Sequence, residues 1–353
     1  MALIRKRKLT EQQQRRIEKQ QQNRQQEFDH SLDLEGLVVQ HYGRQLEVEV
    51  RSLPSVPPTA PQAIEGEPEP FWREIIVGEV WRCHTRTNLD ALVTGDKVTW
   101  QADPNTGLGI ITALHPRQSL LSRPDRYHKL KPVASNVDLI VIVFAVMPEP
   151  SAMLIDRYLV ACHSADIQPL LVLNKADLLA DDDSALKLLE DYQKLGYDTC
   201  ICEAHANNDS PYHPKFLIEK IDNRTVVFVG QSGVGKSSII NTLLPDAEQR
   251  TNIISENSAL GQHTTTSTRL MAFGDNGALI DSPGIREFGL WHLDREQILA
   301  GFREMQDYFG LCKFRNCTHQ HEKDCALRQA VADGKILSRR LDSMNRLLNE
   351  LNA

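Results

Sequence analysis

The sequence lacks any apolar run long enough to cross a membrane. Its longest apolar run, residues 139–147, is far short of the ~20 residues that a membrane-spanning helix needs. No apolar signal-peptide core follows the charges near residue 1. We therefore expect a cytoplasmic protein that makes no contact with a membrane.

The seven cysteines do not form a disulfide framework, because their number is odd and their spacing is uneven. Three of them lie close together, between Cys312 and Cys325. In a reducing compartment such crowding indicates a metal site rather than disulfides.

An excess of positive over negative charge is found in the first 26 residues, while the rest of the chain is acidic overall. The chain has 40 Lys and Arg against 47 Asp and Glu, a net charge of −7, but residues 1–26 hold eight Lys or Arg and only two Glu. That segment contains few large apolar side chains, so burial cannot offset the entropy lost on ordering it. We expect residues 1–33 to form a basic, disordered arm.

The chain of 353 residues is long enough for two or three domains, and its 41% hydrophobic and 25% charged residues are typical of globular proteins. Strand patterns at 36–50, 74–85, 95–100 and 108–114 predict a small β-barrel over residues 34–118, with a Pro-rich loop at 51–72. The strand count fits an oligonucleotide-binding (OB) fold and other small barrels alike.

On the barrel, Tyr42, Trp81, Arg82 and Arg86 are candidates for stacking on RNA bases and contacting phosphates. The alternative for the aromatic residues is ordinary packing inside the barrel.

From residue 119 the pattern changes to alternating strands and helices, which predicts a multidomain α/β protein with a mainly parallel sheet over residues 119–292. The expected strands are 138–146, 169–173, 198–202, 225–229, 267–273 and 278–281, and the expected helices are 152–164, 184–195 and 236–243. Residues 293–353 are helical in period and enclose the cysteine cluster, which predicts a small metal-binding helical domain.

A phosphate-binding P-loop follows the expected strand 225–229 and opens the next helix, as the motif G-x-x-x-x-G-K-[ST] requires. Its glycines let main-chain N–H groups face a phosphate, Lys236 can reach the β- and γ-phosphates, and the Ser237 hydroxyl can ligate Mg²⁺. The loop residues expected to bind nucleotide are Gly230, Gln231, Ser232, Gly233, Val234, Gly235, Lys236, Ser237 and Ser238.

Asn174, Lys175 and Asp177 form an N-K-x-D tetrapeptide after the strand 169–173. A carboxylate at Asp177 can accept hydrogen bonds from both N1–H and the 2-amino group of guanine, a pair of donors that adenine lacks. The motif therefore predicts preference for GTP.

Asp281 and Gly284 fit a D-x-x-G element, in which the Asp holds the Mg²⁺ shell and the Gly senses the γ-phosphate. The segment 261–266 lies just before the expected strand 267–273, at the position where a switch threonine that contacts Mg²⁺ is expected. Both Thr264 and Thr265 suit this position, and we favour Thr265.

The order of these motifs is reversed relative to ordinary GTPases, because Asp177 precedes Gly230. The sequence therefore indicates a circular permutation, which closely spaced termini make possible. One consequence is that the switch segments, 258–290, lead directly into the C-terminal domain, so we expect the nucleotide state to be passed to that domain.

The cluster Cys312-x₄-Cys317-x-His319-x₅-Cys325 offers three thiolates and an imidazole, enough for one closed, structural tetrahedral Zn²⁺ site. The spacing also permits His321 as the imidazole ligand, or cysteines that are merely buried. The basic side chains of Lys313, Arg315 and Lys323 are either RNA contacts or part of a solvated surface.

The reversed motif order, the loop at 230–238, the Gly-Gln-His-Thr-Thr-Thr segment and the metal cluster together resemble the small ribosomal subunit biogenesis GTPase family, RsgA, also called YjeQ, over almost the whole chain. The resemblance implies an N-terminal OB fold, a permuted GTPase domain, a zinc domain with His319 as ligand, and a role in late maturation of the 30S subunit and its rRNA. It also implies GTP hydrolysis stimulated by that subunit.

The resemblance also bears on two single residues. Ras-like GTPases orient the attacking water with a Gln after D-x-x-G, but Ile285 stands there, so His263 is the expected catalytic residue. The guanine loop of the family, usually Ser-Ala, aligns with Glu203-Ala204, where the main-chain N–H of Ala204 is the expected contact.

The leading interpretation is a monomeric, Mg²⁺-dependent GTPase that acts in ribosome assembly. The alternatives are an RNA-binding chaperone that holds GTP as a structural ligand, and a GTPase that acts on a partner other than the ribosome.

Overall fold

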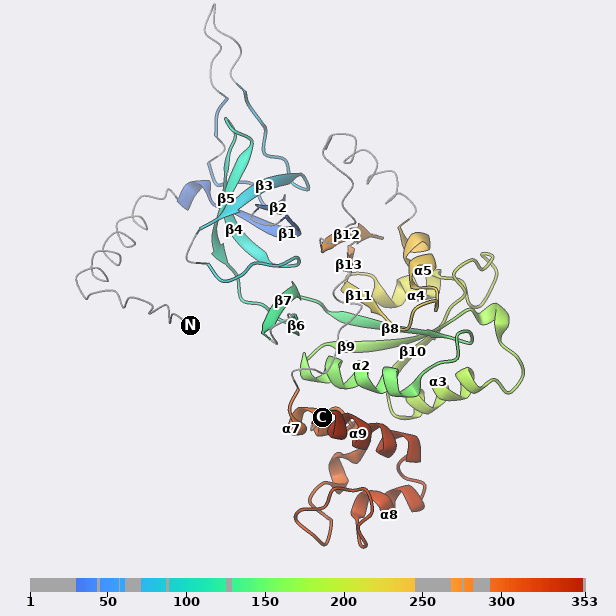
Figure 1. Cartoon of the computed structure of the whole chain (residues 1–353). Coiled ribbons are helices and arrows are strands. Elements are labelled where there is room, and N and C mark those ends of the chain that lie inside the picture. Colours follow the sequence, from blue (N-terminus) through green and yellow to red (C-terminus); the bar gives the residue numbers. More distant parts are fainter. Residues whose placement is uncertain are drawn as a thin grey trace, which may run out of the picture.

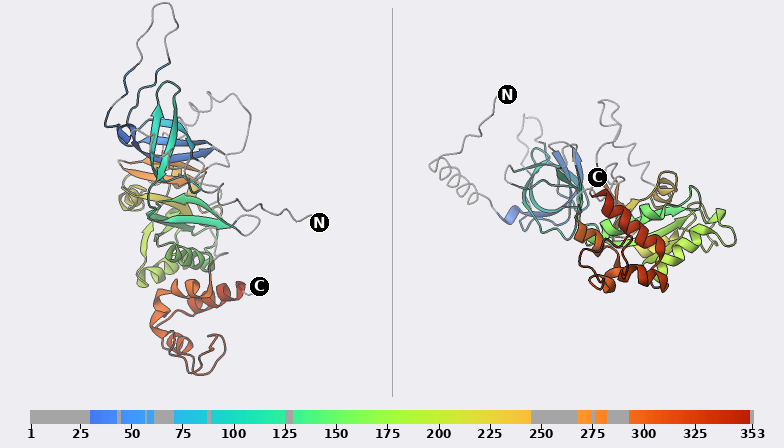
Figure 2. Two further views of the ribbon diagram at one scale, coloured as in Figure 1. Left: turned by 90° about the vertical axis from the view of Figure 1, so that its left-hand side faces the viewer. Right: turned by 60° about the horizontal axis from the view of Figure 1, so that its bottom comes forward.

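The computed structural model describes residues 30–42, 45–56, 58–60, 71–86, 89–124, 129–244, 268–274, 276–281 and 293–351. Three parts follow one another along an elongated molecule: a β-barrel at one end, a central sheet with helices on its faces, and a helical part at the other end (Figures 1 and 2). In the described ranges no helix combines the length and apolar character that crossing a membrane requires.

Five strands form the barrel, in the order β1-β2-β3-β5-β4 with β4 returning to pair with β1. Strands β3 and β5 run parallel and the other neighbours antiparallel. This closed arrangement of five strands is that of an OB fold. The strands are β1 (Leu34–Tyr42), β2 (Gln45–Val50), β3 (Val80–Thr85), β4 (Lys97–Asp103) and β5 (Leu108–Leu114).

Trp81 belongs to the aromatic core of the barrel, and its position rules out the expected stacking on RNA bases. Trp81 is fully buried and its ring lies 5.8 Å from that of Trp100, so it cannot stack on an RNA base. Inward and outward residues alternate along β3, which places Trp81 and Cys83 inside and leaves Arg82 exposed. Packing is the correct interpretation for Trp81.

The expected strand 74–85 is shorter in the structure, where β3 begins at Val80. A turn precedes it, in which the N–H of Glu79 donates to the carbonyl of Ile76 and Gly78 takes a left-handed φ of 89°. This turn ends the extended segment before the barrel strand starts.

A short antiparallel hairpin, β6 (Leu120–Pro124) and β7 (Leu130–Ser135), joins the barrel to the central sheet. The buried carboxylate of Asp96, the residue directly before β4, holds this junction: it accepts hydrogen bonds from Arg117 at 2.7 and 2.8 Å and from the Ser135 hydroxyl. The barrel and the linker are thereby fixed to one another.

The central sheet has the order β10-β9-β8-β11-β13-β12, parallel except for β12. Strand β12 also pairs with β1 through Arg269 and Gln40, so the sheet and the barrel form one continuous eleven-stranded sheet. The strands are β8 (Leu139–Ala145), β9 (Gln168–Asn174), β10 (Asp198–Ile201), β11 (Thr225–Val229), β12 (Arg269–Phe273) and β13 (Gly277–Asp281). β8 is buried along its whole length, as expected for a strand covered on both faces.

Helices cover both faces of the central sheet. One face carries α4 (Lys215–Ile221) and α5 (Lys236–Leu243), which share an apolar core with β8, β10 and β11. The other carries α2 (Ala152–Ser164) and α3 (Ser184–Lys194), whose core continues into the C-terminal helices.

The C-terminal helical part packs against α2 (Figure 1). It consists of α7 (Arg295–Ala300), the 3₁₀ helix η3 (Arg303–Tyr308), α8 (Ala326–Ala332) and α9 (Ser338–Glu350). Two further 3₁₀ turns, η1 (His30–Leu32) and η2 (Ala176–Leu178), lie before β1 and after β9. Residues 1–29 of the expected basic arm lie outside the described residues.

Candidate nucleotide and metal sites

The P-loop lies between the carboxyl end of β11 and the first turn of α5, as the sequence predicts. The ammonium of Lys236 donates to the carbonyls of Gly230 and Gln231, at 2.7 Å each, so it lies within the curve of the loop. Main-chain N–H groups at the start of α5 face the same region, which makes this loop a suitable cradle for phosphates.

The N-K-x-D segment at the end of β9 lies directly against the P-loop. The Asn174 side-chain amide donates to the carbonyl of Val234 at 2.9 Å, and the Lys175 ammonium donates to that of Gly233 at 2.8 Å. Gly235 has a φ of 92°, and a Cβ there would overlap the Asn174 amide. Position 235 therefore requires a glycine, because only glycine adopts this left-handed φ readily and leaves room for the Asn174 amide.

Asp177 lies exposed in η2, one turn beyond this contact. A third loop borders the same site: the carbonyl of Cys202 accepts from the N–H of Ala176, and the carbonyl of Ala204 accepts from the Thr242 hydroxyl on α5. The structure thus brings the P-loop, the N-K-x-D segment and the Ala204 loop together at the carboxyl ends of the parallel strands, where ligands of open α/β sheets bind.

The Asn174 side chain has a further property that points to a ligand. Its Oδ1 atom is buried and has no hydrogen-bond partner among the described residues. A buried acceptor without a partner costs free energy, which is tolerated where a ligand or another group supplies the donor.

The residues expected around Mg²⁺ are only partly described. Ser237 is exposed at the start of α5 and Asp281 ends β13, the neighbour of β11. His263, Thr264, Thr265 and Gly284 lie outside the described residues, as does the segment 282–292 that leads into the C-terminal helices.

The metal cluster is assembled as the sequence predicts: one ligand atom from each of four side chains lies within 4.8 Å of the others. The four residues are Cys312, Cys317, His319 and Cys325. The Nδ1 atom of His319 is 3.5 Å from the sulfurs of Cys312 and Cys325, which are 3.9 Å apart. His321 is exposed and is not part of this group. The cluster could hold a metal ion.

Two side chains support the loop that carries His319. The Glu322 carboxylate accepts hydrogen bonds from the hydroxyl and main-chain N–H of Thr318 and from the N–H groups of Gln320 and His321. The two bonds from Thr318 contribute most to lowering the Glu322 pKa well below its usual value. Asn345 on α9 donates to the carbonyl of His319 at 3.4 Å. These contacts fix the main chain at and beside His319, in the way that outer-shell contacts support ligands in metal sites.

Sequence reasoning missed the contacts that α2 and the loop before it make with the N-K-x-D segment and the P-loop. The Lys175 ammonium also donates to the carbonyl of Met147, at 2.6 Å. Burial raises the pKa of Tyr158, and a hydrogen bond from the main chain of Gly230 to its hydroxyl partly offsets this rise. A tyrosine inside an amphipathic helix is an ordinary core residue by pattern, so no motif pointed to it.

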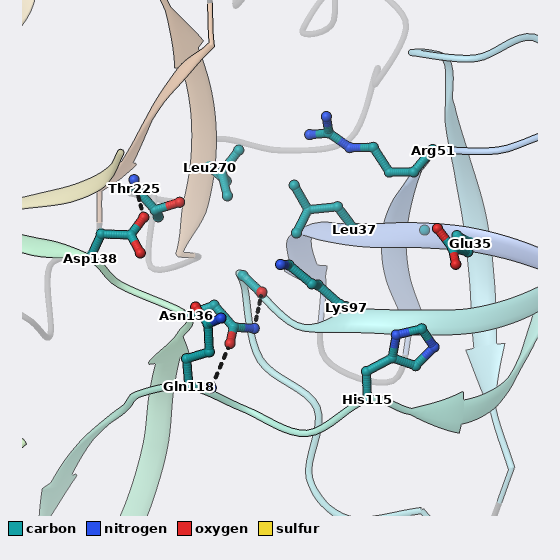
Figure 3. Close-up of a pocket in the computed structure, with 12 residues that line it drawn as sticks. Glu35, Leu37, Arg51, Lys97, His115, Gln118, Asn136, Asp138, Thr225 and Leu270 are labelled. Atoms are coloured by element: carbon teal, nitrogen blue, oxygen red, sulfur yellow. Dashed lines mark hydrogen bonds between the residues drawn. The ribbon is translucent and has the colours of Figure 1, made fainter. Parts of the chain in front are cut away.

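A cavity of about 370 Å³ lies apart from these sites, between the barrel and the central sheet. Figure 3 shows Lys97 and Arg51 of the barrel facing Asp138 and Thr225 of the sheet across it. The Asp138 carboxylate accepts from the N–H of Thr225 at 2.7 Å. Because Glu35 also lines this cavity, its acidic and basic side chains balance, and nothing marks it as a site for an anion.

The fold and the loops define the class of protein. A P-loop and an N-K-x-D segment meet at one edge of a mainly parallel sheet, in reversed chain order, and Asp281 ends the strand next to the P-loop strand. The same fold has an OB barrel and a helical part with a cluster that could hold a metal. This is a circularly permuted P-loop GTPase fold.

Comparison with known proteins identifies the family. The sequence model of the RsgA GTPase family matches residues 114–291. The small ribosomal subunit biogenesis GTPases RsgA of Pseudomonas fluorescens strains Pf0-1 and Pf-5 are 49% and 50% identical to the chain over 318 residues, covering 90% of the chain and 85% of each relative. The chain therefore belongs to the RsgA GTPase family.

Two solved structures are similar to this chain over most of its length. The crystal structure of YjeQ from Thermotoga maritima is similar with a TM-score of 0.67 and 28% identity, covering 91% of this chain and 99% of that one. The crystal structure of YloQ, a circularly permuted GTPase, gives a TM-score of 0.64 and 27% identity, covering 92% of this chain and 96% of that one.

Proposed function

We propose that this protein hydrolyses GTP to GDP and phosphate, with Mg²⁺, during maturation of the small ribosomal subunit in the bacterial cytoplasm. The contact of the Asn174 amide with Val234 carries the proposal, because it joins the guanine-recognition segment to the phosphate loop in one site. Membership of the RsgA GTPase family supplies the activity and the partner. One chain carries every element of the nucleotide site, which supports a monomer.

The guanine end of the site is formed by Asp177 and Ala204. The Asp177 carboxylate accepts from the two guanine donors, and the main-chain N–H of Ala204 contacts the base. Asn174 and Lys175 position this end by tying it to the P-loop, at 2.9 and 2.8 Å. The exposure of Asp177 and the burial of Asn174 fit these two roles.

The phosphate end is formed by the P-loop, residues 230–238, with Lys236 pairing with the β- and γ-phosphates. Ser237, Asp281 and Thr265 are the oxygen donors that would hold Mg²⁺, which prefers such ligands. When bound, Mg²⁺ neutralises charge that develops on the phosphates. Gly284 contacts the γ-phosphate and His263 orients the attacking water.

The metal cluster holds zinc in a structural role. A tetrahedral Zn²⁺ with Zn–S of about 2.3 Å and Zn–N of about 2.0–2.1 Å requires S···S and S···N separations of about 3.8 and 3.5 Å. The observed separations of 3.9 and 3.5 Å fit these values. Three thiolates and one imidazole complete the coordination, so no position remains for a water or substrate.

The test is turnover of GTP by the full chain, alone and with isolated small subunits. We expect slow hydrolysis alone and a large stimulation by the subunits, and co-sedimentation with them when a non-hydrolysable GTP analogue is present. Tight GTP binding without turnover under both conditions would favour an RNA-binding chaperone. Turnover that subunits leave unchanged, without co-sedimentation, would favour a different partner.

A further inference from the structure

A buried ion-pair cluster joins the metal-binding part to helix α2. The Arg340 side chain on α9 is fully buried; its Nη1 donates to Asp156 on α2 at 2.6 Å, and its Nε and Nη2 donate to Glu304 on η3 at 2.6 and 3.1 Å. The Tyr192 hydroxyl on α3 also donates to the Asp156 carboxylate. The cluster therefore links α9 and η3 of the C-terminal part to α2 directly, and to α3 through the bond between Tyr192 and Asp156.

The apolar packing around this cluster is continuous. Ile155 and Leu159 on α2 belong to the same core as Phe302 and Met344 of the C-terminal part. The Arg340 guanidinium also lies 4.5 Å from the centre of the Phe302 ring. Figures 1 and 2 show α2 between the central sheet and the C-terminal helices. The cluster is thus enclosed within a well-packed interface.

The same helix contacts the proposed nucleotide site on its other side. Two positions after Asp156, the Tyr158 hydroxyl bonds to the main chain of Gly230, the first residue of the P-loop. The loop before α2 supplies the Met147 carbonyl to Lys175 of the N-K-x-D segment, at 2.6 Å. A displacement of α2 would therefore move groups that hold both the phosphate and the guanine loops.

We propose that Arg340 is a positioning residue for the nucleotide site: by holding Asp156 it fixes α2, and α2 in turn holds the P-loop and the N-K-x-D segment. This inference rests on the proposed function, since it concerns the affinity of the same site for guanine nucleotide. It makes the metal-binding part a component of nucleotide binding, although none of its described residues belongs to the nucleotide loops.

The geometry requires arginine at this position. The planar guanidinium presents separate edges to Asp156 and to Glu304, whereas a lysine has one nitrogen and cannot reproduce both contacts. A lysine would nevertheless keep a positive charge beside the carboxylates of Asp156 and Glu304. The substitution therefore does not leave these two negative charges without a positive partner. Arg340→Lys thus loosens the link while limiting the risk of unfolding.

The experiment measures the binding of fluorescent methylanthraniloyl-GDP, and the kcat and KM for GTP, in the zinc-loaded full chain. Arg340→Lys and Tyr158→Phe should each raise the Kd for GDP and the KM for GTP by about 2- to 30-fold. The kcat should stay unchanged, because an interaction that supports substrate and transition state equally affects only KM. A role confined to folding would instead lower the active fraction and leave Kd and KM unchanged.

The matched control is Glu350→Gln. It removes the exposed ion pair of Glu350 with Arg157, which also joins α9 to α2, at 2.6 Å, and it should leave Kd and KM unchanged. Wild-type affinity in Arg340→Lys, with zinc retained, overturns the inference, whether or not Tyr158→Phe weakens binding. Equal weakening in Glu350→Gln overturns it too. If the wild-type chain binds neither GDP nor GTP, the proposed function itself fails.

Discussion

The side-chain amide of Asn174 donates a hydrogen bond of 2.9 Å to the main-chain oxygen of Val234, 60 residues further along the chain. This contact unites the two halves of the proposed nucleotide site despite the reversed order of their motifs. The site depends on which strand ends lie side by side, and β9, β8 and β11 are neighbours in the sheet. The circular permutation therefore changes the order in which the chain connects the strands, but the strand ends that carry the two motifs still lie close together.

Gly235→Ala tests this contact. An alanine Cβ would overlap the Asn174 amide, and the φ of 92° is unfavourable for any residue with a side chain. We expect the Kd for GDP to rise at least about 10-fold, equivalent to about 1.4 kcal/mol. Isothermal titration calorimetry of the full chain measures it.

Gly196→Ala is the matched control, because Gly196 has a similar φ of 82° but no atom within 4 Å of the added Cβ. It should destabilise the fold by about 1–2 kcal/mol through backbone strain and leave nucleotide affinity unchanged. Similar losses of affinity in both variants would show that strain, rather than the contact with Asn174, is responsible.

Asp177→Asn tests the specificity for guanine. The asparagine keeps the size of the side chain but cannot accept hydrogen bonds from both guanine donors with one carbonyl oxygen. Since hydrogen bonds to a charged group contribute about 1.5–3 kcal/mol each, GTP affinity should fall by about 10- to 100-fold. Competition of GTP and ATP against labelled GDP measures the change, and the weak affinity for ATP should not decrease. An unaltered preference for GTP would exclude Asp177 from base recognition.

Local motifs could be predicted from the sequence because each depends on residues close together in the chain. The strand at 225–229, the glycines after it and Lys236 gave the P-loop, and four ligands within fourteen positions gave the metal cluster. The alternation of side chains in a strand also indicated the correct position of Trp81, on the same inner face as Cys83. A residue on the inner face of a closed barrel, such as Trp81, is packed in the core and is not available to RNA.

Other features depend on contacts that no local pattern contains. Asp156 and Arg340 are 184 residues apart, and each is an ordinary charged residue of a helix until the fold buries them together. The hairpin of β6 and β7 was also missed, because each strand carries a proline, Pro124 and Pro132, which argues against a strand. Tertiary packing determines both.

His263→Ala tests the proposed role in hydrolysis. A residue that orients the attacking water acts in the transition state, so its loss should lower subunit-stimulated kcat by about 10²- to 10⁴-fold with little change in GTP affinity. Single-turnover phosphate release measures the rate. The control His163→Ala changes an exposed histidine at the end of α2 and should keep the full rate. If subunit-stimulated turnover is unchanged in His263→Ala, a group other than His263 orients the attacking water.

Removal of the metal tests the structural role of the cluster. Metal ligation by Cys325 and its partners would join the loop at 312–325 to α8, which begins directly after Cys325. Because metal binding to such small folds contributes about 10–16 kcal/mol of apparent folding energy, chelation should unfold this loop and expose α8. Hydrogen exchange in residues 312–332 should then accelerate strongly, and added zinc should reverse the change.

Cys325→Ser should produce the same acceleration without a chelator, since serine is a poor zinc ligand. The control Cys200→Ser alters a buried thiol on β10, outside the cluster, and should leave exchange in residues 312–332 unchanged. Metal analysis of each variant shows whether zinc is bound. Unaltered exchange in a chain proven free of metal would mean that the apolar contacts of Leu327 and Ala330 with the shared core are sufficient to hold α8 in place.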